Sequence, residues 1–211
     1  DGTGDVHLLG YFPNYHDRNF QEHLLRFREG RVNGAKLMVD KLRELGLPVD
    51  WERVRSIADG ASVGRPHIAQ AMVERGYINS QKDAFKEYLQ DGGKAHIARP
   101  HILVADAVSL IKSVGGVAVL AHPLYLSNYP DLIANLTKIG VVGMEVHYAE
   151  FTPTQRSKLI RLANQYNLLP CGGSDYHAFG SPNEHLPGTA GPPLEVFQKL
   201  EALSAPVRKE D

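Results

Sequence analysis

The chain has 211 residues, enough to bury one sizeable core and a smaller second domain. Its 23 Lys and Arg residues nearly balance 24 Asp and Glu residues, which argues against long duplex nucleic acid as an obligate partner and against a membrane surface. The single cysteine, Cys171, excludes an internal disulfide, and no apolar run is long enough to span a bilayer. We therefore expect an intracellular, cytoplasmic protein with no membrane partner.

The first hundred residues read as one strand followed by helices. The apolar segment 5–12 predicts a strand, and it contains His7. Helical spacing and capping signals then predict helices over about 20–44, after Asp50, after Pro66 and over about 80–90. Because no good strand is found there, we predict a helical insertion domain over residues 16–100.

After residue 100, helices and strands alternate. The pattern predicts helices over 103–114, 130–138 and 153–166, and strands over 117–121, 141–147 and 168–172. Alternation of this kind, with nearly continuous apolar strands, is typical of parallel strands covered by helices on both faces. Residues 1–15 and 101–211 are thus predicted to form an α/β sheet or barrel. Its functional edge is expected at the carboxyl ends of the strands, where His122, His147 and Asp175 fall.

Two segments at that edge carry residue types that bind metal ions. Asp175 and His177 are two apart, so in an extended segment they project to the same side, and Gly172 and Gly173 leave room beside them. A carboxylate beside imidazoles suits Zn, Mn or Fe, which lower the pKa of a bound water until hydroxide forms near neutral pH. Alternatively, Asp175 caps a helix and His177 is a surface residue. His122, which follows a buried strand, favours the metal site.

Three more residues near this edge have competing interpretations. His7 lies in an apolar strand, where it is either a metal ligand or a core histidine bonded to a backbone carbonyl. His147 shares one side of its strand with Glu145, and structural hydrogen bonding is its expected role. Cys171 is expected to be a small buried apolar residue rather than a nucleophile.

Anion binding is expected in the helical domain. Arg65 stands at the start of a helix whose first turn holds Pro66 and His67, and a guanidinium beside helix amides suits a phosphate. Lys94 lies in a glycine turn followed by His96, although the turn lacks the pattern of a phosphate-binding loop. The candidate phosphate ligands are therefore Arg65, His67 and Lys94. The alternative for Arg65 and for His67 is a solvated residue with no ligand.

Four motifs occur in an order that resembles a known family. They are Val6-His7-Leu8-Leu9-Gly10-Tyr11-Phe12, Gly64-Arg65-Pro66-His67-Ile68-Ala69, Gly115-Gly116-Val117-Ala118-Val119-Leu120-Ala121-His122-Pro123 and Gly172-Gly173-Ser174-Asp175-Tyr176-His177. Together they resemble the polymerase-and-histidinol-phosphatase (PHP) superfamily. The helical insertion with its Gly-Arg-Pro-His motif resembles the branch that acts on nucleoside phosphates and short RNA.

The resemblance implies a fold, a metal centre and a substrate class. The fold would be a partial, distorted (β/α)7 PHP barrel, and a complete site would hold two or three divalent ions, Mn, Zn, Fe or Mg. By resemblance, His7, His122, Asp175 and His177 are metal ligands, and the catalytic group is a metal-bound water held by His122, Asp175 and His177. The substrate would be a small nucleotide or a short oligonucleotide, and the activity phosphoester hydrolysis.

The sequence also departs from the family's pattern. The family carries a His-x-His pair, an Asp, a Thr-Asp-His segment and a Glu ahead of the strand that holds His7, and none of these is present here. Each ion takes four or more donors, so the ligands that remain cannot saturate a centre of two or three ions. We therefore expect a fragment or processed chain whose barrel is completed by an N-terminal segment or by a second chain.

Two rival functions remain open at this point. The chain could be a non-catalytic or incomplete PHP module that has lost the early ligands. It could also be a histidinol-phosphatase-like or amidohydrolase-like enzyme on the same metal scaffold, although the helical insertion with Arg65 argues against this by analogy.

Overall fold

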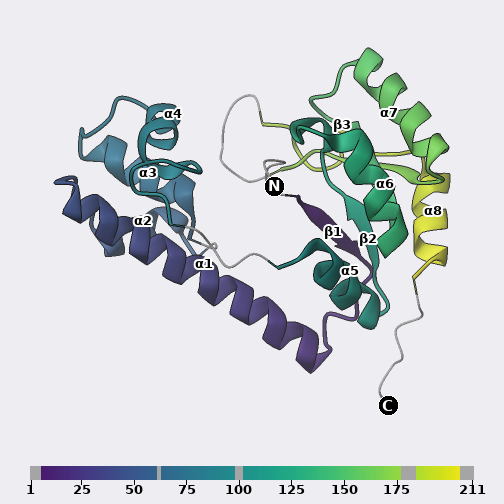
Figure 1. The fold of residues 1–211 in the computed structure, drawn as a ribbon, viewed down its shortest axis with the longest axis horizontal. Helices are drawn as coiled ribbons and strands as arrows, with labels where there is room; N and C mark the ends of the chain where they lie inside the picture. The colour runs from purple at the N-terminus through teal and green to yellow at the C-terminus, as the bar shows by residue number, and fades with distance from the viewer. Residues whose placement is uncertain (1–5, 61–62, 98–101, 177–183, 205–211) are drawn as a thin grey trace. The chain divides into compact units, whose positions relative to one another are not determined.

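The computed structural model describes residues 6–60, 63–97, 102–176 and 184–204 (Figure 1). Its internal contacts divide the chain into two compact units, residues 1–17 with 102–211 and residues 18–101. The strands lie in the first unit, and the described part of the second unit is helical. Among the described residues, no helix is long and apolar enough to cross a membrane.

The first unit is built on a sheet of four strands in the order β1-β2-β3-β4. The strands are β1 (Leu8–Tyr11), β2 (Val117–Leu120), β3 (Val141–Tyr148) and β4 (Leu169–Gly173). The parallel pairing of β2, β3 and β4 confirms the prediction, whereas β1 runs antiparallel to β2, with Leu8 opposite Leu120. The start of β1 therefore lies at the edge where the other three strands end.

Helices cover both faces of this sheet (Figure 1). They are α5 (Val104–Ser113), α6 (Tyr129–Ile139), α7 (Pro153–Gln165) and α8 (Leu194–Ala202). The first three pack on one face, whereas α8 packs on the other through Val196 and Leu200. All four residues of β2 are buried, two toward each face, which explains why the strand is apolar throughout.

The pairing of β3 with β4 depends on a glycine. A Cβ at Gly172 would lie 2.2 Å from the backbone oxygen of His147, closer than any side chain allows. The register of the two strands shifts between Glu145 and His147, beside this contact. Gly172 therefore permits a close approach of two backbones, directly before the loop that carries Asp175.

The second unit consists of a long helix and several short ones. They are α1 (Arg18–Glu44), α2 (Trp51–Ala58), α3 (Arg65–Glu74), α4 (Gln81–Ala84) and the π-helical turn η1 (Phe85–Leu89). The single helix predicted over 80–90 thus changes to π-helical hydrogen bonding, and the N–H of Gln90 donates to Phe85 O. Only the second half of α1 enters the core of this unit, through Ala35, Met38, Val39 and Leu42.

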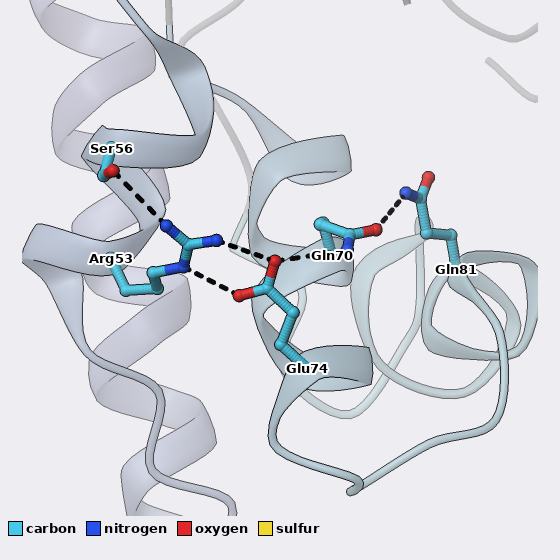
Figure 2. Close-up of polar contacts among 5 residues, drawn as sticks. All are labelled: Arg53, Ser56, Gln70, Glu74 and Gln81. Carbon is cyan, nitrogen blue, oxygen red and sulfur yellow. Dashed lines mark hydrogen bonds and ion pairs between the residues drawn. The ribbon is translucent and has the colours of Figure 1, made fainter. Parts of the chain in front are cut away.

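Polar contacts join α2, α3 and the start of α4. Arg53 donates two hydrogen bonds to the carboxylate of Glu74, at 2.7 and 2.9 Å, and Gln70 links Glu74 to Gln81 (Figure 2). The side chain of Asp50 accepts from the N–H of Glu52, which confirms the predicted N-cap of α2. These contacts join short helices that pack on a shared apolar core. Helices of this length are only marginally stable in isolation.

Candidate metal centre and phosphate-binding cluster

Two histidines from distant parts of the chain meet at the functional edge of the sheet. His122 lies two residues after β2, and His7 precedes β1, whose antiparallel pairing brings it to the same edge. The N–H of Ala121 donates to His7 O at 3.0 Å, which extends the pairing by one residue. The two side chains face each other, with His7 Nδ1 3.1 Å from His122 Nε2 and the rings nearly perpendicular.

The distance between these nitrogens fits a shared metal ion. Two imidazole ligands of one tetrahedral ion, each about 2.05 Å from it, have nitrogens about 3.4 Å apart. A single proton shared between His7 and His122 also gives a contact of this length, and the two arrangements differ by a small displacement of the rings. The pair thus presents two nitrogen donors of the kind that Zn, Mn and Fe accept.

The backbone of His122 is held from inside the sheet. His122 has a φ of 26°, outside the regions that side-chain-bearing residues ordinarily occupy. Its N–H donates to Oε2 of Glu145 at 2.8 Å, and Glu145 is only 5% exposed in the middle of β3. Burial raises the pKa of the Glu145 carboxyl, and the hydrogen bond from His122 opposes that shift. Sequence reasoning gave Glu145 no role of its own, although a charged residue inside an apolar strand was the available signal.

Asp175 is tied to the same edge through Tyr148. It lies two residues after β4, and its Oδ2 accepts a hydrogen bond from the Tyr148 hydroxyl at 2.8 Å. The Tyr148 ring centre lies 6.1 Å from that of His122. Burial and the bond to Asp175 raise the pKa of Tyr148. Asp175 has a φ of 53°, so the chain turns there. The sequence had predicted an extended segment at this position. His177 lies outside the described residues.

Aromatic side chains line this edge beside the histidine. Tyr125 lies on the short turn after His122, with its ring centre 5.3 Å from the imidazole, and its hydroxyl donates to Glu150 at 2.6 Å. Phe151, just beyond β3, contacts both Tyr125 and Tyr148. No motif singled out these residues, since only their positions after strand ends distinguish them from other aromatic residues. They shield one side of His122, whose Nδ1 is buried without a hydrogen-bond partner among the described residues.

The described residues bring two candidate metal ligands into contact. Within the ranges that the structure describes, no three His, Cys, Asp or Glu side chains gather closely enough to bind one ion. What gathers is the His7–His122 pair, with Asp175 connected to it through the Tyr148 ring. This donor set fits a borderline divalent ion chemically, and it leaves coordination positions for other donors.

Of the predicted phosphate ligands of the helical unit, Arg65 contacts Asp91, and His96 contacts the same carboxylate. Arg65, the first residue of α3, places Nη1 3.1 Å from Oδ1 of Asp91 and 3.4 Å from Leu89 O. His96 Nε2 lies 3.3 Å from the same carboxylate oxygen. Lys94, two residues before His96, has its ammonium 5.1 Å from the ring centre of Tyr88. A carboxylate thus sits where a guanidinium and an imidazole converge.

His67 acts as a capping residue at the start of α3. Its Nδ1 accepts the N–H of Gly64 at 3.0 Å, which satisfies a backbone donor at the start of α3. Burial lowers the pKa of His67, so the neutral, hydrogen-bond-accepting form is favoured. A role in phosphate binding stays a prediction for His67, while the structure gives it a local structural function.

Two further candidates lie among apolar neighbours. Burial raises the pKa of the Cys171 thiol to about 12, and the residue is 2% exposed, as expected of a small apolar side chain. Burial and the nearby charge of Arg156 lower the pKa of His147 in β3. Neither residue presents the reactive form that nucleophilic catalysis would require of Cys171 or acid catalysis of His147.

Comparisons with known proteins find similar chains among enzymes that act on phosphate esters. No protein-family model matches the chain. The 5'-3' exoribonuclease Rnm of Escherichia coli strain K12 is 30% identical over 177 residues, which are 82% of this chain and 60% of the relative. The 3',5'-nucleoside bisphosphate phosphatase of Chromobacterium violaceum is 26% identical, over 95% of this chain and 73% of the relative. A crystal structure from Bifidobacterium adolescentis, described as a metal-dependent phosphoesterase, superposes with a TM-score of 0.78 at 27% identity, covering 95% of this chain and 72% of that one.

The chain has a mixed α/β fold, and this fold is similar to that of a metal-dependent phosphoesterase. These similar proteins carry the names of phosphoesterases and nucleases, and they support the resemblance to the PHP superfamily that the motifs indicate. It spans about 60% of the length of the exoribonuclease it matches.

Proposed function

We propose that this chain carries part of the catalytic centre of a divalent-metal-dependent phosphoesterase that hydrolyses phosphate esters of nucleotides or short oligonucleotides. The observation that carries the proposal is the convergence of His7 and His122 at the carboxyl edge of the parallel strands. A metal ligand pair at this edge of an α/β fold is placed where such folds build their active sites.

The residues that would hold the metal are His7, His122 and Asp175, together with His177 on the strength of the motif. Mn, Zn, Fe or Mg are the ions that this donor chemistry and the family allow. When bound, such an ion supplies a hydroxide nucleophile near neutral pH and neutralises charge on the phosphoryl oxygens. Glu145 fixes the backbone of His122, and Tyr148 orients Asp175 by donating to one of its oxygens.

The helical unit would bind phosphate groups of the substrate through Arg65 and His96, with Lys94 beside them. The support is the carboxylate of Asp91, which both Arg65 and His96 contact, because a carboxylate oxygen has the charge and acceptor geometry of a phosphate oxygen. The names of the relatives, an exoribonuclease and a nucleoside bisphosphate phosphatase, both describe substrates with more than one phosphate. That chemistry suits a protein with an anion-binding cluster besides its metal ligands.

A second candidate function is a metal- and nucleotide-binding module without catalysis by itself. It is favoured by the described residues, in which only two donors converge on one point. In that case, an N-terminal segment or a second chain would supply the remaining donors of the barrel. The two functions differ in one measurable property, since only the first releases phosphate.

The test combines metal binding with turnover. We expect the protein to bind Mn and to release phosphate from a nucleoside 3',5'-bisphosphate in a Mn-dependent manner. His122→Ala and Asp175→Asn should each weaken Mn binding by about tenfold or more. His185→Ala, at an exposed residue outside the predicted ligand set, is the matched control. Equal Mn affinity in all four proteins would refute the ligand assignment, and intact Mn binding without phosphate release would favour the module.

A further inference from the structure

A cavity in the helical unit has no role in the function proposed so far. It lies between α1 and α2, has a volume of about 690 Å³ and is open to solvent. Arg28 and Lys36 of α1 and Trp51 and Arg55 of α2 line it, together with the buried Val63. The volume lies within the range of about 300–1,000 Å³ of small-molecule sites.

The cavity combines an aromatic surface with cations. Trp51 is half-buried, since it packs against the core of the unit while its ring also lines the cavity. The ammonium of Lys36 lies 5.6 Å from the centre of the Trp51 ring. An indole surface of this kind can stack on a nucleobase, and the adjacent ammonium, on a flexible stem, can reach a phosphate.

The charges of the cavity favour an anion at one side. Arg28 and Lys36 are exposed on one helix, and neither forms an ion pair with another residue in the described part of the chain. Arg55 is paired with Glu52 at 3.2 Å, and Asp59 is a second acidic residue of the lining. The uncompensated positive charge therefore lies on the α1 side, beside the Trp51 ring.

The lining of the cavity is close in the chain to a residue of the cluster around Asp91. Val63, in its lining, is two residues before Arg65, whose guanidinium contacts Asp91. Two residues of extended chain span at most about 7 Å. A ligand longer than one nucleotide that engages Arg65 would therefore have the cavity within reach inside the same unit.

We propose that this cavity binds one nucleotide of a single-stranded oligonucleotide substrate, with its base against Trp51 and its phosphates near Arg28 and Lys36. The inference rests on the proposed function for the class of substrate. It adds a second recognition site, distinct from the cluster around Arg65. Stacking on an aromatic side chain tolerates any base, so affinity at this site would depend on the length of the oligonucleotide more than on its base sequence.

The single tryptophan of the sequence makes the test direct, because all tryptophan fluorescence comes from the lining of the cavity. The probe is 5'-phosphorylated pentaadenylate, titrated in EDTA so that no metal-dependent cleavage takes place. We expect saturable quenching of Trp51 fluorescence by this probe. Inorganic tripolyphosphate, which has charge but no base, should not quench it.

Variants then test whether Arg28 and Lys36 contribute to binding of the oligonucleotide. Arg28→Gln and Lys36→Gln should each weaken binding of the oligonucleotide about threefold to tenfold. The double variant should reduce the slope of log Kd against log salt by about 1.4, because each phosphate contact to a single strand contributes about 0.7. Lys41→Gln, on the same helix but outside the cavity lining, is the matched control and should bind like the parent. Trp51→Leu, followed through a fluorescein-labelled oligonucleotide, should bind about fivefold or more weakly.

Specific results would overturn the proposal. They are absence of quenching, equal quenching by tripolyphosphate, or the same affinity in Lys36→Gln and Lys41→Gln. Thermal unfolding of each variant shows whether it is folded, and Lys36→Gln keeps the test decisive if Trp51→Leu fails to fold. Failure here with Mn-dependent phosphate release intact would reject only the second recognition site. Quenching that responds to Lys36→Gln without any phosphate release would reject only the hydrolytic function.

Discussion

Glu145 Oε2 accepts a hydrogen bond from the backbone N–H of His122 at 2.8 Å, across two neighbouring parallel strands. The contact joins a buried carboxylate in β3 to the residue whose imidazole faces His7. It holds His122 at a φ of 26°, a conformation that needs compensation from its surroundings. The orientation of the candidate metal ligand therefore depends on a buried residue of the neighbouring strand.

Two substitutions of Glu145 should distinguish the effect of its hydrogen bond to His122 from the effect of its charge. Glu145→Leu leaves the N–H of His122 buried without an acceptor, which should lower the free energy of unfolding by about 1–3 kcal/mol. It should also weaken Mn binding by about 10- to 100-fold, the usual cost of losing a partner that orients a metal ligand. Glu145→Gln keeps an acceptor oxygen and should lose less in both measurements, urea unfolding and Mn titration. Equal losses in the two variants would show that the carboxylate charge matters and not the hydrogen bond.

His67 should make the stability of the helical unit depend on pH. Its Nδ1 accepts from Gly64, and burial lowers its pKa, so the folded protein favours the neutral form. That contribution to stability is complete above the ordinary pKa of about 6.5 and is lost as the pH falls through the lowered pKa of the folded state. Between pH 7 and pH 5, unfolding followed by Trp51 fluorescence should show a larger loss of stability in the parent than in His67→Gln. Glutamine at this position can accept the same N–H without titrating.

The control for this prediction is His67→Ala, which removes the acceptor at every pH. It should be less stable than the parent at pH 7 by about 1 kcal/mol, the usual cost of losing a helix cap. The gap should close toward pH 5, because the protonated His67 no longer accepts the N–H of Gly64. A constant gap between His67→Ala and the parent over this range would contradict the capping role.

A methyl group at Gly172 should disrupt the pairing of β3 with β4. Its Cβ would lie 2.2 Å from His147 O and 2.6 Å from His147 C, and these backbone atoms can move only if the strands separate. Gly172→Ala should therefore lower the free energy of unfolding by about 1–3 kcal/mol or more. Gly191→Ala, where a Cβ would meet nothing within 4 Å, should change it by less than about 0.5 kcal/mol. Similar urea midpoints for the two variants would show that the strands can adjust.

The sequence predicted those parts of the structure that depend on local signals. The strand at 117–121 was found because all four residues of β2 are buried and its apolar run is uninterrupted. The strands at 141–147 and 168–172 were found because their runs are nearly continuous in apolar residues. The N-cap at Asp50 was found because the Asp50 side chain and the N–H of Glu52 that it caps lie only two residues apart. His122 and Asp175 were placed at one edge because parallel strands end together.

The features that escaped prediction depend on contacts between distant residues. The antiparallel pairing of β1 brings His7 to His122, 115 residues away, and nothing in the apolar pattern of 5–12 indicates the direction of that strand. The bond from His122 to Glu145 requires the register of β2 with β3. The chain turns at Asp175, where φ is 53°. An Asp can adopt this conformation, but the residue type alone does not predict it.

Asp91 should compete with phosphate for Arg65 and His96. Its carboxylate lies 3.1 Å from the guanidinium and 3.3 Å from the imidazole, yet its own side chain is 71% exposed and can turn away. Asp91→Asn removes the negative charge from the cluster, so a nucleoside 3',5'-bisphosphate should bind roughly fivefold more tightly in EDTA, measured by calorimetry. Asp40→Asn, which breaks an exposed ion pair with Arg43 on α1, is the matched control and should leave this affinity unchanged. The gain should disappear in the double variant Asp91→Asn with Arg65→Gln, because the guanidinium that the carboxylate released is then absent. Tighter binding that survives the loss of Arg65 would place the phosphate elsewhere, and no gain in Asp91→Asn would reject the cluster as a phosphate site.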